Sequence, residues 1–344
     1  MTQQHPFLQA CRRQPVRRVP VWLMRQAGRY MPEYRARRES HTILELCHAP
    51  ELAAEVTLQP IKRFDLDAAI IFADILLPLE GFGVGFHFAK GEGPIIEKPI
   101  RKPADVGTLR PFDPTVDLGY VLEAIRIVRR ELADRVPLIG FAAAPFTLAS
   151  YMIEGGSSRH HQLMKSFMYQ HPQAWDQLMC AVREMTRDYL AAQIEAGAQA
   201  VQLFDSWVGC LSPEDYRSYV LPHSQWVLEG LARYDVPRIH FGTNTATLLT
   251  AMKEAGGEVL GVDWRLPIAE ARKLIGSDFA VQGNLDPVLL MAPRQLLVDR
   301  VNGILQQADA RTGFIFNLGH GVLPQTPMES VAAVIDAVHA FQLG

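Results

Sequence analysis

Residues 238–282 contain three short β-like runs in close succession: Arg238-Ile239-His240-Phe241, Val259-Leu260-Gly261-Val262 and Phe279-Ala280-Val281-Gln282. Apolar and β-branched residues dominate these runs, and the stretches between them carry helical signals. Strands that alternate with helices in this way form parallel sheets, because each helix returns the chain to the same end of the sheet. This stretch therefore indicates an α/β fold built from βα repeats.

The same alternation extends to both sides of this stretch. Further strand candidates are Asp67–Phe72, Leu138–Phe141, Ala200–Phe204 and Phe314–Asn317, with Val21–Met24 as an eighth strand. Eight such strands without a long linker predict a single-domain (β/α)8 barrel of the TIM type over residues 1–344, with the main repeats at 67–342. A doubly wound sheet is disfavoured, because no G-x-G-x-x-G follows the first strand.

One insertion interrupts the repeats. Phe86-His87-Phe88 and Ile95-Ile96-Glu97 flank Gly91-Glu92-Gly93-Pro94, which is the pattern of a β-hairpin. Because the insertion follows the strand at 67–72, we expect it near the mouth at the carboxyl ends of the strands, where insertions shape substrate pockets.

Two helix starts are also predicted. Ser212-Pro213 has the pattern of an N-cap followed by proline in the first turn, and Thr326-Pro327-Met328-Glu329 that of a capping box before the last helix.

The composition excludes several classes of protein. The chain has 344 residues, of which 48% are hydrophobic and 21% are charged, so disorder, collagen and coiled coil are disfavoured. No apolar run approaches the length of a membrane span, and the N-terminus lacks the apolar core of a signal peptide. The four cysteines (Cys11, Cys47, Cys180 and Cys210) contain no C-x-x-C, which excludes a disulfide scaffold and a local zinc knuckle. We expect a soluble cytoplasmic protein without a membrane partner.

The charge is distributed unevenly. The chain has a net charge of −3, but residues 1–38 hold nine arginines and one acid and carry +8, so the remainder carries −11. Residues 1–20 are predicted to form a basic arm. A nucleic-acid partner is disfavoured, because the rest of the chain would repel phosphate and an apolar segment at 19–24 interrupts the basic stretch. Arginines suit a small molecule with several carboxylates; the alternative is a solvated basic face.

In a (β/α)8 barrel, polar residues just after the strands are the candidates for function. Here they are Arg25, Arg29, Asp74, Asp205, Ser206, His240, Asp263, Asn284 and His320. Structural alternatives exist for several: Asp205 and Asp263 could cap loops or pair with an arginine, His240 could be a core histidine, and Asn284 could form a turn into a helix. Asp74 is different because it interrupts an apolar run from Ala68 to Leu77, where a carboxylate must be desolvated or paired.

Four sequence blocks resemble a known family. Residues 22–30 (WLMRQAGRY) and 140–156 (GFAAAPFTLASYMIEGG) resemble the first and second signatures of the uroporphyrinogen decarboxylase family. Residues 70–76 (IIFADIL) and 317–321 (NLGHG) resemble two further blocks of that family. The resemblance covers roughly residues 6–342, with the blocks in the same order.

The resemblance implies removal of four acetate carboxyl groups from uroporphyrinogen III, which gives coproporphyrinogen III and CO2 in haem biosynthesis. It also implies a single (β/α)8 barrel, a homodimer, and no cofactor or metal. Asp74, Arg25 and Arg29 are then the catalytic candidates. The implied substrate-binding residues are Arg25, Gln26, Ala27, Gly28, Arg29, Asp74, Tyr151, Ser206 and His320.

The chemistry of this substrate agrees with the residues. A macrocycle with eight carboxylates outside and four pyrrole N–H groups inside suits arginines at the rim and one carboxylate at the centre. Protonation of a pyrrole ring creates a cation that Asp74 would stabilise while CO2 leaves. The proton donor stays open between an arginine, His320 and a carboxylic acid group of the substrate.

Two other functions are considered. Zinc-dependent methyltransferases share the fold and carry a His-x-Cys pair, but Ile239-His240-Phe241-Gly242 has phenylalanine in place of the thiolate. The other alternative is a non-catalytic tetrapyrrole- or nucleic-acid-binding protein, which the intact set of residues at the predicted mouth disfavours.

Overall fold

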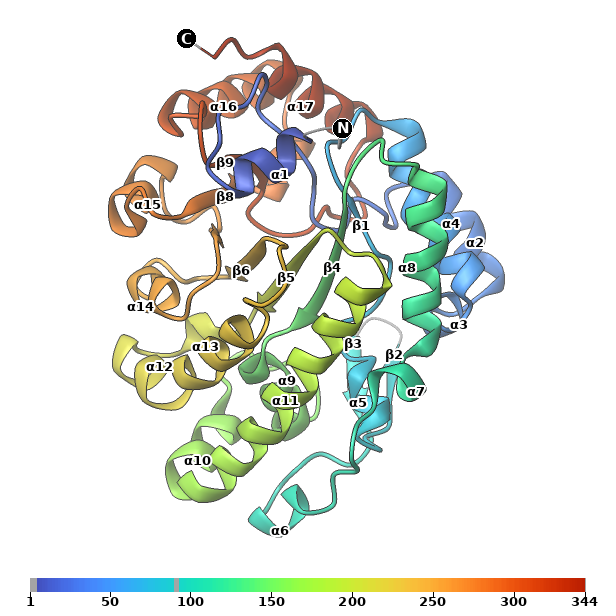
Figure 1. The fold of residues 1–344 in the computed structure, drawn as a ribbon, viewed down its shortest axis with the longest axis vertical. Coiled ribbons are helices and arrows are strands. Elements are labelled where there is room, and N and C mark those ends of the chain that lie inside the picture. The colour runs from blue at the N-terminus through green and yellow to red at the C-terminus, as the bar shows by residue number, and fades with distance from the viewer. Residues whose placement is uncertain (1–4, 90–92, 344) are drawn as a thin grey trace.

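The computed structural model describes residues 5–89 and 93–343, in which parallel strands form a curved sheet surrounded by helices (Figure 1). The strands pair in the order β1-β4-β5-β6-β7-β8-β9, and every neighbouring pair is parallel. They are β1 (Ala69–Ile70), β4 (Leu138–Ala143), β5 (Ala200–Asp205), β6 (Arg238–Gly242), β7 (Val259–Gly261), β8 (Ala280–Leu285) and β9 (Phe314–Leu318). The predicted α/β fold is confirmed, with each of the seven predicted main strands in place.

From α2 onward, the helices follow one another around the outside of the strands in chain order, from blue to red in Figure 1, whereas α1 lies over the strands. The helices of nine or more residues are α2 (Pro32–Ser40), α4 (Pro50–Arg63), α8 (Gly119–Leu132), α9 (Pro145–Glu154), α10 (Gln162–Gln170), α11 (Pro172–Ala196), α13 (Leu221–Gly230), α16 (Arg294–Gln307) and α17 (Met328–Ala340). The shorter ones are α1 (Pro6–Cys11), α3 (Ile43–His48), α5 (Pro78–Gly81), α6 (Pro103–Val106), α7 (Pro114–Asp117), η1 (Val208–Cys210), α12 (Pro213–Tyr219), α14 (Leu249–Glu254), α15 (Ile268–Ile275) and η2 (Pro287–Met291). Within the described residues, no helix combines the length and the apolar character needed to cross a membrane.

The predicted eighth strand is present only as an isolated bridge. Val21 pairs with Phe316 of β9 in parallel, and its carbonyl accepts a hydrogen bond from the backbone N–H of Asp67 on the other side. Longer pairing does not form because Pro20 has no N–H and the Met24 N–H donates to the Asn317 side chain at 3.0 Å. The segment at 20–24 nevertheless lies between β9 and the start of β1, so it closes the barrel.

The N-terminal segment packs against the barrel. Phe7, Ala10 and Cys11 of α1 are fully buried and belong to the same core cluster as Ile139 and Ile239 of the strands. The arginines that suggested a basic arm bond to the protein itself: Arg12 pairs with Asp235 at 3.0 Å, and Arg13 donates to the Ser277 carbonyl at 2.9 Å. Described residues before 20 therefore anchor this end of the barrel.

Polar side chains join the strands inside the barrel. Trp22 donates from Nε1 to Gln282 at 2.9 Å, and Gln282 donates in turn to Gln202 at 3.1 Å. All three side chains are fully buried. The hydrogen bonds link β5, β8 and the closing segment and offset part of the cost of burying the two glutamines, since the Gln202 Nε2 has no partner within the described residues.

Local predictions have mixed outcomes. The Ser212 hydroxyl accepts the Asp215 N–H at 3.1 Å, which confirms the predicted N-cap of α12. The capping box at Thr326 is wrong: α17 begins at Met328, with Pro327 as its N-cap and no side-chain cap. Proline fixes the backbone at the helix start, so the Thr326 hydroxyl is not placed over the first turn.

The insertion after β1 contains two antiparallel strands. β2 (Phe86–Ala89) pairs with β3 (Gly93–Ile96), and Ile95 forms a bridge with Gly156 after α9. Of the predicted turn at 91–94, residues 91 and 92 lie outside the described residues, and Gly93 and Pro94 begin β3.

Candidate active site at the barrel mouth

The predicted site residues follow the carboxyl ends of different strands. The loop at 25–29 follows the closing segment, Asp74 follows β1, Ser206 follows β5 and His320 follows β9. Tyr151 lies on α9, the helix that begins two residues after β4. Because the strands are parallel, these segments all emerge at one end of the barrel.

Asp74 is held without an ion pair among the described residues. Its Oδ1 accepts the Leu76 N–H at 2.9 Å, and its neighbours in the chain, Ala73 and Ile75, are apolar. Burial raises the pKa of Asp74, opposed by the Leu76 hydrogen bond and by the charge of Arg25, while Glu80 raises it further. The protein therefore keeps a desolvated carboxylate whose acceptor capacity is only partly satisfied.

Arg25 connects the predicted residues electrostatically. Its charge acts on the pKa of Asp74, of Tyr151 and of His320, so these groups surround one region. Its backbone has a φ of 60°, the left-handed conformation that non-glycine residues seldom adopt. Non-glycine residues held in this conformation cluster at functional sites, which supports Arg25 as a site residue.

Two glycines make room for Arg25. A Cβ at position 28 would lie 2.9 Å from the Arg25 carbonyl oxygen, and a Cβ at 321 would lie 2.6 Å from Arg25 Cγ. Gly28 thus permits the tight turn of the loop itself, and Gly321 lets the Arg25 side chain pass over the loop after β9.

The remaining residues of the 25–29 loop differ in role. Gln26 is buried, donates to the Ala68 carbonyl at 3.0 Å and accepts the Leu23 N–H at 3.1 Å, so its side chain fixes the loop. Ala27 is half-buried and packs against the core. Arg29 is exposed; its charge and that of Asp74 act in opposite senses on the pKa of Tyr34, which burial raises.

His320 has a defined tautomer. Nδ1 lies 2.7 Å from the Gly321 N–H and accepts it, which leaves the proton on Nε2. Burial and the charges of Arg25 and Arg265 lower the pKa of His320 to about 4, against an opposing effect of Asp263. The imidazole is therefore neutral at pH 7, with its Nε2–H available to donate a hydrogen bond.

Aromatic side chains line the same end of the barrel. Tyr151 stacks on Trp207 with ring centroids 3.9 Å apart, and burial, with Asp74, raises the pKa of Tyr151 to about 12. Phe204 meets Phe141 edge-on at 5.5 Å. Ser206 lies between Phe204 and Trp207 in the chain, and its carbonyl accepts the Thr243 hydroxyl. Within the described residues, the Ser206 hydroxyl makes no hydrogen bond to Asp74 or Arg25, so Ser206 is the least connected of the candidate residues.

Arg265 was missed from the sequence. Its guanidinium bonds to Asp263 at 2.6 Å and lies over the Trp264 ring at 4.2 Å, and its charge acts on His320. Asp263 also accepts the N–H groups of Asn244 and Arg265, which agrees with the loop-capping alternative. The sequence signal that could have found Arg265 is its position two residues after Asp263, a polar residue at a strand end.

Three other strand-end residues contact their neighbours inside the barrel, although both ring nitrogens of His240 are without a hydrogen-bond partner among the described residues. Asp205 accepts the Thr147 hydroxyl at 3.0 Å and faces His240, whose Nε2 is 3.8 Å away, and both side chains are fully buried. Asn284 lies within β8, not in a turn, and donates to the carbonyls of Asp263 and Leu266. It ties the loop after β7 to β8.

The chain matches known proteins along its whole length. Residues 2–341 match the family model described as uroporphyrinogen decarboxylase. The chain is 57% identical over 334 residues to a uroporphyrinogen decarboxylase of Sorangium cellulosum, covering 97% of this chain and 95% of the relative. It is 55% identical over 333 residues to that of Carboxydothermus hydrogenoformans, with the same coverage of both chains.

A solved structure has a similar fold. A methyltransferase from Methanosarcina mazei superposes with a TM-score of 0.82, covers 98% of both chains and shares 22% of residues. At this identity the likeness concerns the fold alone. Phe241 is buried inside the barrel here, with its ring 5.8 Å from that of Phe204, so this position offers a metal no thiolate.

Proposed function

The chain belongs to the uroporphyrinogen decarboxylase family and is an enzyme of the carboxy-lyase class. From this premise we propose that it removes the four acetate carboxyl groups of uroporphyrinogen III, giving coproporphyrinogen III and CO2 in porphyrin biosynthesis. The observation that carries the proposal is Asp74, a desolvated carboxylate beside Arg25 and Tyr151.

Asp74 suits the centre of the macrocycle. Four pyrrole N–H groups converge there, and a carboxylate with free acceptor positions can take several of them at once. Ala73, Ile75 and the rings of Phe141 and Phe204 offer apolar surface to the faces of the pyrroles. Desolvation strengthens the interaction, because the carboxylate exchanges little water for the substrate.

Donors at the rim suit the carboxylates of the substrate. Arg25 and Arg29 carry exposed guanidinium groups, and His320 presents its Nε2–H. Arg265 adds a fourth donor on the loop after β7, at 46% side-chain exposure. Gln26, Ala27 and Gly28 shape the loop that carries the first two arginines, while Tyr151 and Ser206 lie on the β4 and β5 sides.

The reaction needs an electron sink, which the substrate supplies. A proton adds to a pyrrole carbon and creates a cation; the C–C bond to the carboxylate then breaks, its electron pair neutralises the cation, and CO2 leaves. The exocyclic carbon takes a proton, and the ring releases the first one, so each acetate becomes a methyl group with one proton consumed. Asp74 stabilises the cationic states more than the neutral ground state, and this difference lowers the barrier.

The direct test is turnover. Anaerobic, reducing incubation with uroporphyrinogen III should release CO2 and yield coproporphyrinogen, measured as the oxidised porphyrins. Binding of the substrate without loss of CO2 would instead support the non-catalytic tetrapyrrole-binding alternative. Methyl transfer to a thiol would support the methyltransferase alternative, which the family match does not favour.

We further propose that the enzyme is a cytoplasmic homodimer. Val288, Met291 and Leu296 are large apolar side chains that are 43–56% exposed, and they lie close together in the chain just after the mouth end of β8. Such exposure supports self-association at this surface. Sedimentation should give the mass of a dimer, and Val288→Asp with Met291→Asp should shift it to the monomer.

A further inference from the structure

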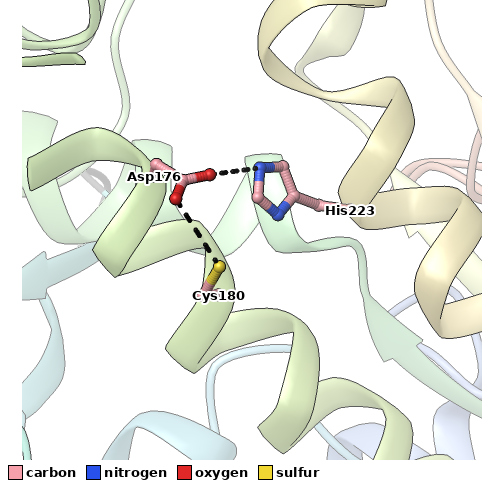
Figure 2. A group of neighbouring side chains, drawn as sticks. All are labelled: Asp176, Cys180 and His223. Atoms are coloured by element: carbon pink, nitrogen blue, oxygen red, sulfur yellow. Dashed lines mark hydrogen bonds and ion pairs between the residues drawn. The ribbon is translucent and has the colours of Figure 1, made fainter. Parts of the chain in front are cut away.

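Three side chains of types that can bind a metal lie close together in the outer layer of helices. Asp176 and Cys180 are one turn apart on α11, and Figure 2 shows His223 of α13 pointing toward them. Asp176 Oδ1 is 3.6 Å from His223 Nε2, and Asp176 Oδ2 is 3.9 Å from Cys180 Sγ. One donor atom from each residue lies within 4.8 Å of the others. None of the three takes part in the proposed reaction.

We propose that Asp176, Cys180 and His223 form a binding site for Zn²⁺ that links α11 to α13. Zinc accepts nitrogen, sulfur and carboxylate ligands at about 2.0–2.3 Å, so its ligands in a tetrahedron are about 3.3–3.8 Å apart. The 3.6 Å distance from Nε2 to Oδ1 falls within this range. The Sγ distance of 3.9 Å involves the other oxygen, and the Asp176 side chain is 69% exposed and free to rotate one oxygen toward both partners. A hard cation such as Mg²⁺ would not take the thiolate.

Its position makes the imidazole the best-placed ligand. The His223 side chain is buried, so its orientation is fixed, and its Nε2 faces Asp176. The Cys180 thiol is partly buried one turn further along α11. On binding, the S–H proton passes to water and the sulfur electron pair forms the Zn–S bond. Water fills the fourth position.

Arg183 opposes the metal and provides a sharp test. Its Nη1 lies 3.5 Å from His223 Nδ1, and its guanidinium lies over the Trp226 ring at 4.8 Å. When Nε2 binds zinc, Nδ1 carries a proton and needs an acceptor, which arginine is not. Arg183→Gln removes the charge and supplies an amide oxygen, so it should tighten zinc binding by about tenfold, the scale of changes next to metal ligands.

The experiment is a calorimetric titration of the full chain with Zn²⁺ alone, which measures stoichiometry and affinity. We expect one equivalent to bind with release of one proton, and the melting temperature to rise with zinc concentration. Co²⁺ in place of zinc should give a sulfur-to-metal charge-transfer band. Cys180→Ser should abolish that band, and Cys180→Ser and His223→Gln should each weaken binding at least tenfold. Asp176→Asn should weaken it less, because the amide oxygen can still coordinate.

Matched controls exist in the same chain. Cys210→Ser removes another partly buried thiol, and His48→Gln removes a histidine 3.0 Å from Glu80. Both should bind zinc like the unchanged protein. Absence of stoichiometric binding, or binding that survives Cys180→Ser and His223→Gln, would overturn the proposal. Decarboxylation should be unaffected by these substitutions, so a failure here leaves the proposed function untouched.

Discussion

Asp74 combines two properties that a structural residue would not need, desolvation and the absence of an ion pair within the described residues. Asp74→Asn keeps the oxygen that accepts the Leu76 N–H but removes the charge that stabilises a cationic transition state. Turnover should fall by roughly 10²- to 10⁴-fold, the scale of losing one preorganised electrostatic partner. The measurement is kcat/KM on a folded preparation; near-normal turnover there would remove Asp74 from the mechanism.

The same substitution has a pH signature in stability. The pKa of Asp74 in the folded protein lies above the usual 3.8, so the unfolded chain loses this proton more readily than the folded one. The ionised side chain therefore costs stability above the folded pKa, and the cost disappears as pH falls below 3.8. Asp74→Asn should raise the Tm at pH 7 and have little effect at pH 3.5 or so. An equal shift at both pH values would contradict this.

Arg29 and Arg13 allow a comparison of two arginines. Arg29 is exposed at the mouth, whereas Arg13 bonds to the Ser277 carbonyl in the N-terminal segment that packs on the barrel. Arg29→Lys should cost about 1–3 kcal/mol of transition-state stabilisation, because an ammonium group cannot form the bidentate pair. Arg13→Lys should leave kcat/KM unchanged. Equal losses of kcat/KM from the two substitutions would contradict a special role for Arg29 in substrate binding.

Individual site residues could be predicted unevenly. Asp74 was recognisable because a charge inside an apolar run is costly, and Arg25 because it lies in a dense arginine segment. Arg265 was not, because its place beside His320 depends on Gly319, where a Cβ would lie 2.5 Å from the Trp264 nitrogen. Nor was the neutral state of His320 predictable, since it follows from burial and from two arginines on other loops.

At the scale of elements, the loop after β9 positions the loop at 25–29. Gly321→Ala should push the Arg25 side chain aside, because the added methyl group would occupy its path. We expect kcat/KM to fall roughly 10- to 100-fold, as for a small misplacement of a binding group. Gly303→Ala on α16, where a Cβ meets nothing within 4 Å, is the control and should leave turnover unchanged. If both variants retained full activity, Gly321 would have no positioning role.

Asp67 fastens the closing segment of the barrel. It is buried, accepts the Val21 N–H at 2.8 Å, and contacts Arg18 and His339, each at 2.8 Å. Asp67→Asn should reduce the free energy of unfolding by about 2–4 kcal/mol, since charged hydrogen bonds in a buried position are lost. Asp65→Asn removes a 70% exposed partner of the same Arg18 and should cost under about 1 kcal/mol. Urea unfolding measures both, and equal losses would refute the assignment.

An element could be predicted when neighbouring residues determine it, and could not when contacts with residues distant in sequence determine it. The seven main strands are short apolar runs between turns, and such runs indicate buried parallel strands without further information. Val21–Met24 forms one bridge because its partners, Asn317 and Asp67, are distant in sequence and replace ladder bonds with side-chain bonds. The burial of α1 was equally hidden, because the arginines that follow it dominate the composition of the N-terminal segment, while its own apolar residues pack into the barrel.

At the scale of the whole molecule, we predict that decarboxylation needs no added metal. Phe241 follows His240, so this stretch holds no His-x-Cys pair for zinc, and the proposed zinc site lies on α11 and α13. Dialysis against a strong chelator should therefore leave turnover unchanged while removing any zinc bound at Cys180. Loss of activity that zinc restores would show this prediction to be wrong.

Closure of the barrel by residues 20–24 also sets an order of events during synthesis. The Met24 N–H and its acceptor on Asn317 are 293 residues apart, and Asp67 meets His339 across 272 residues. The ribosome must therefore synthesise β9 and α17 before residues 20–24 and Asp67 can form these contacts. Non-local contacts of this kind slow folding and leave partly built barrels prone to aggregation. Arg25 and Arg29, translated well before β9 and α17, are thus among the last residues to acquire their working positions.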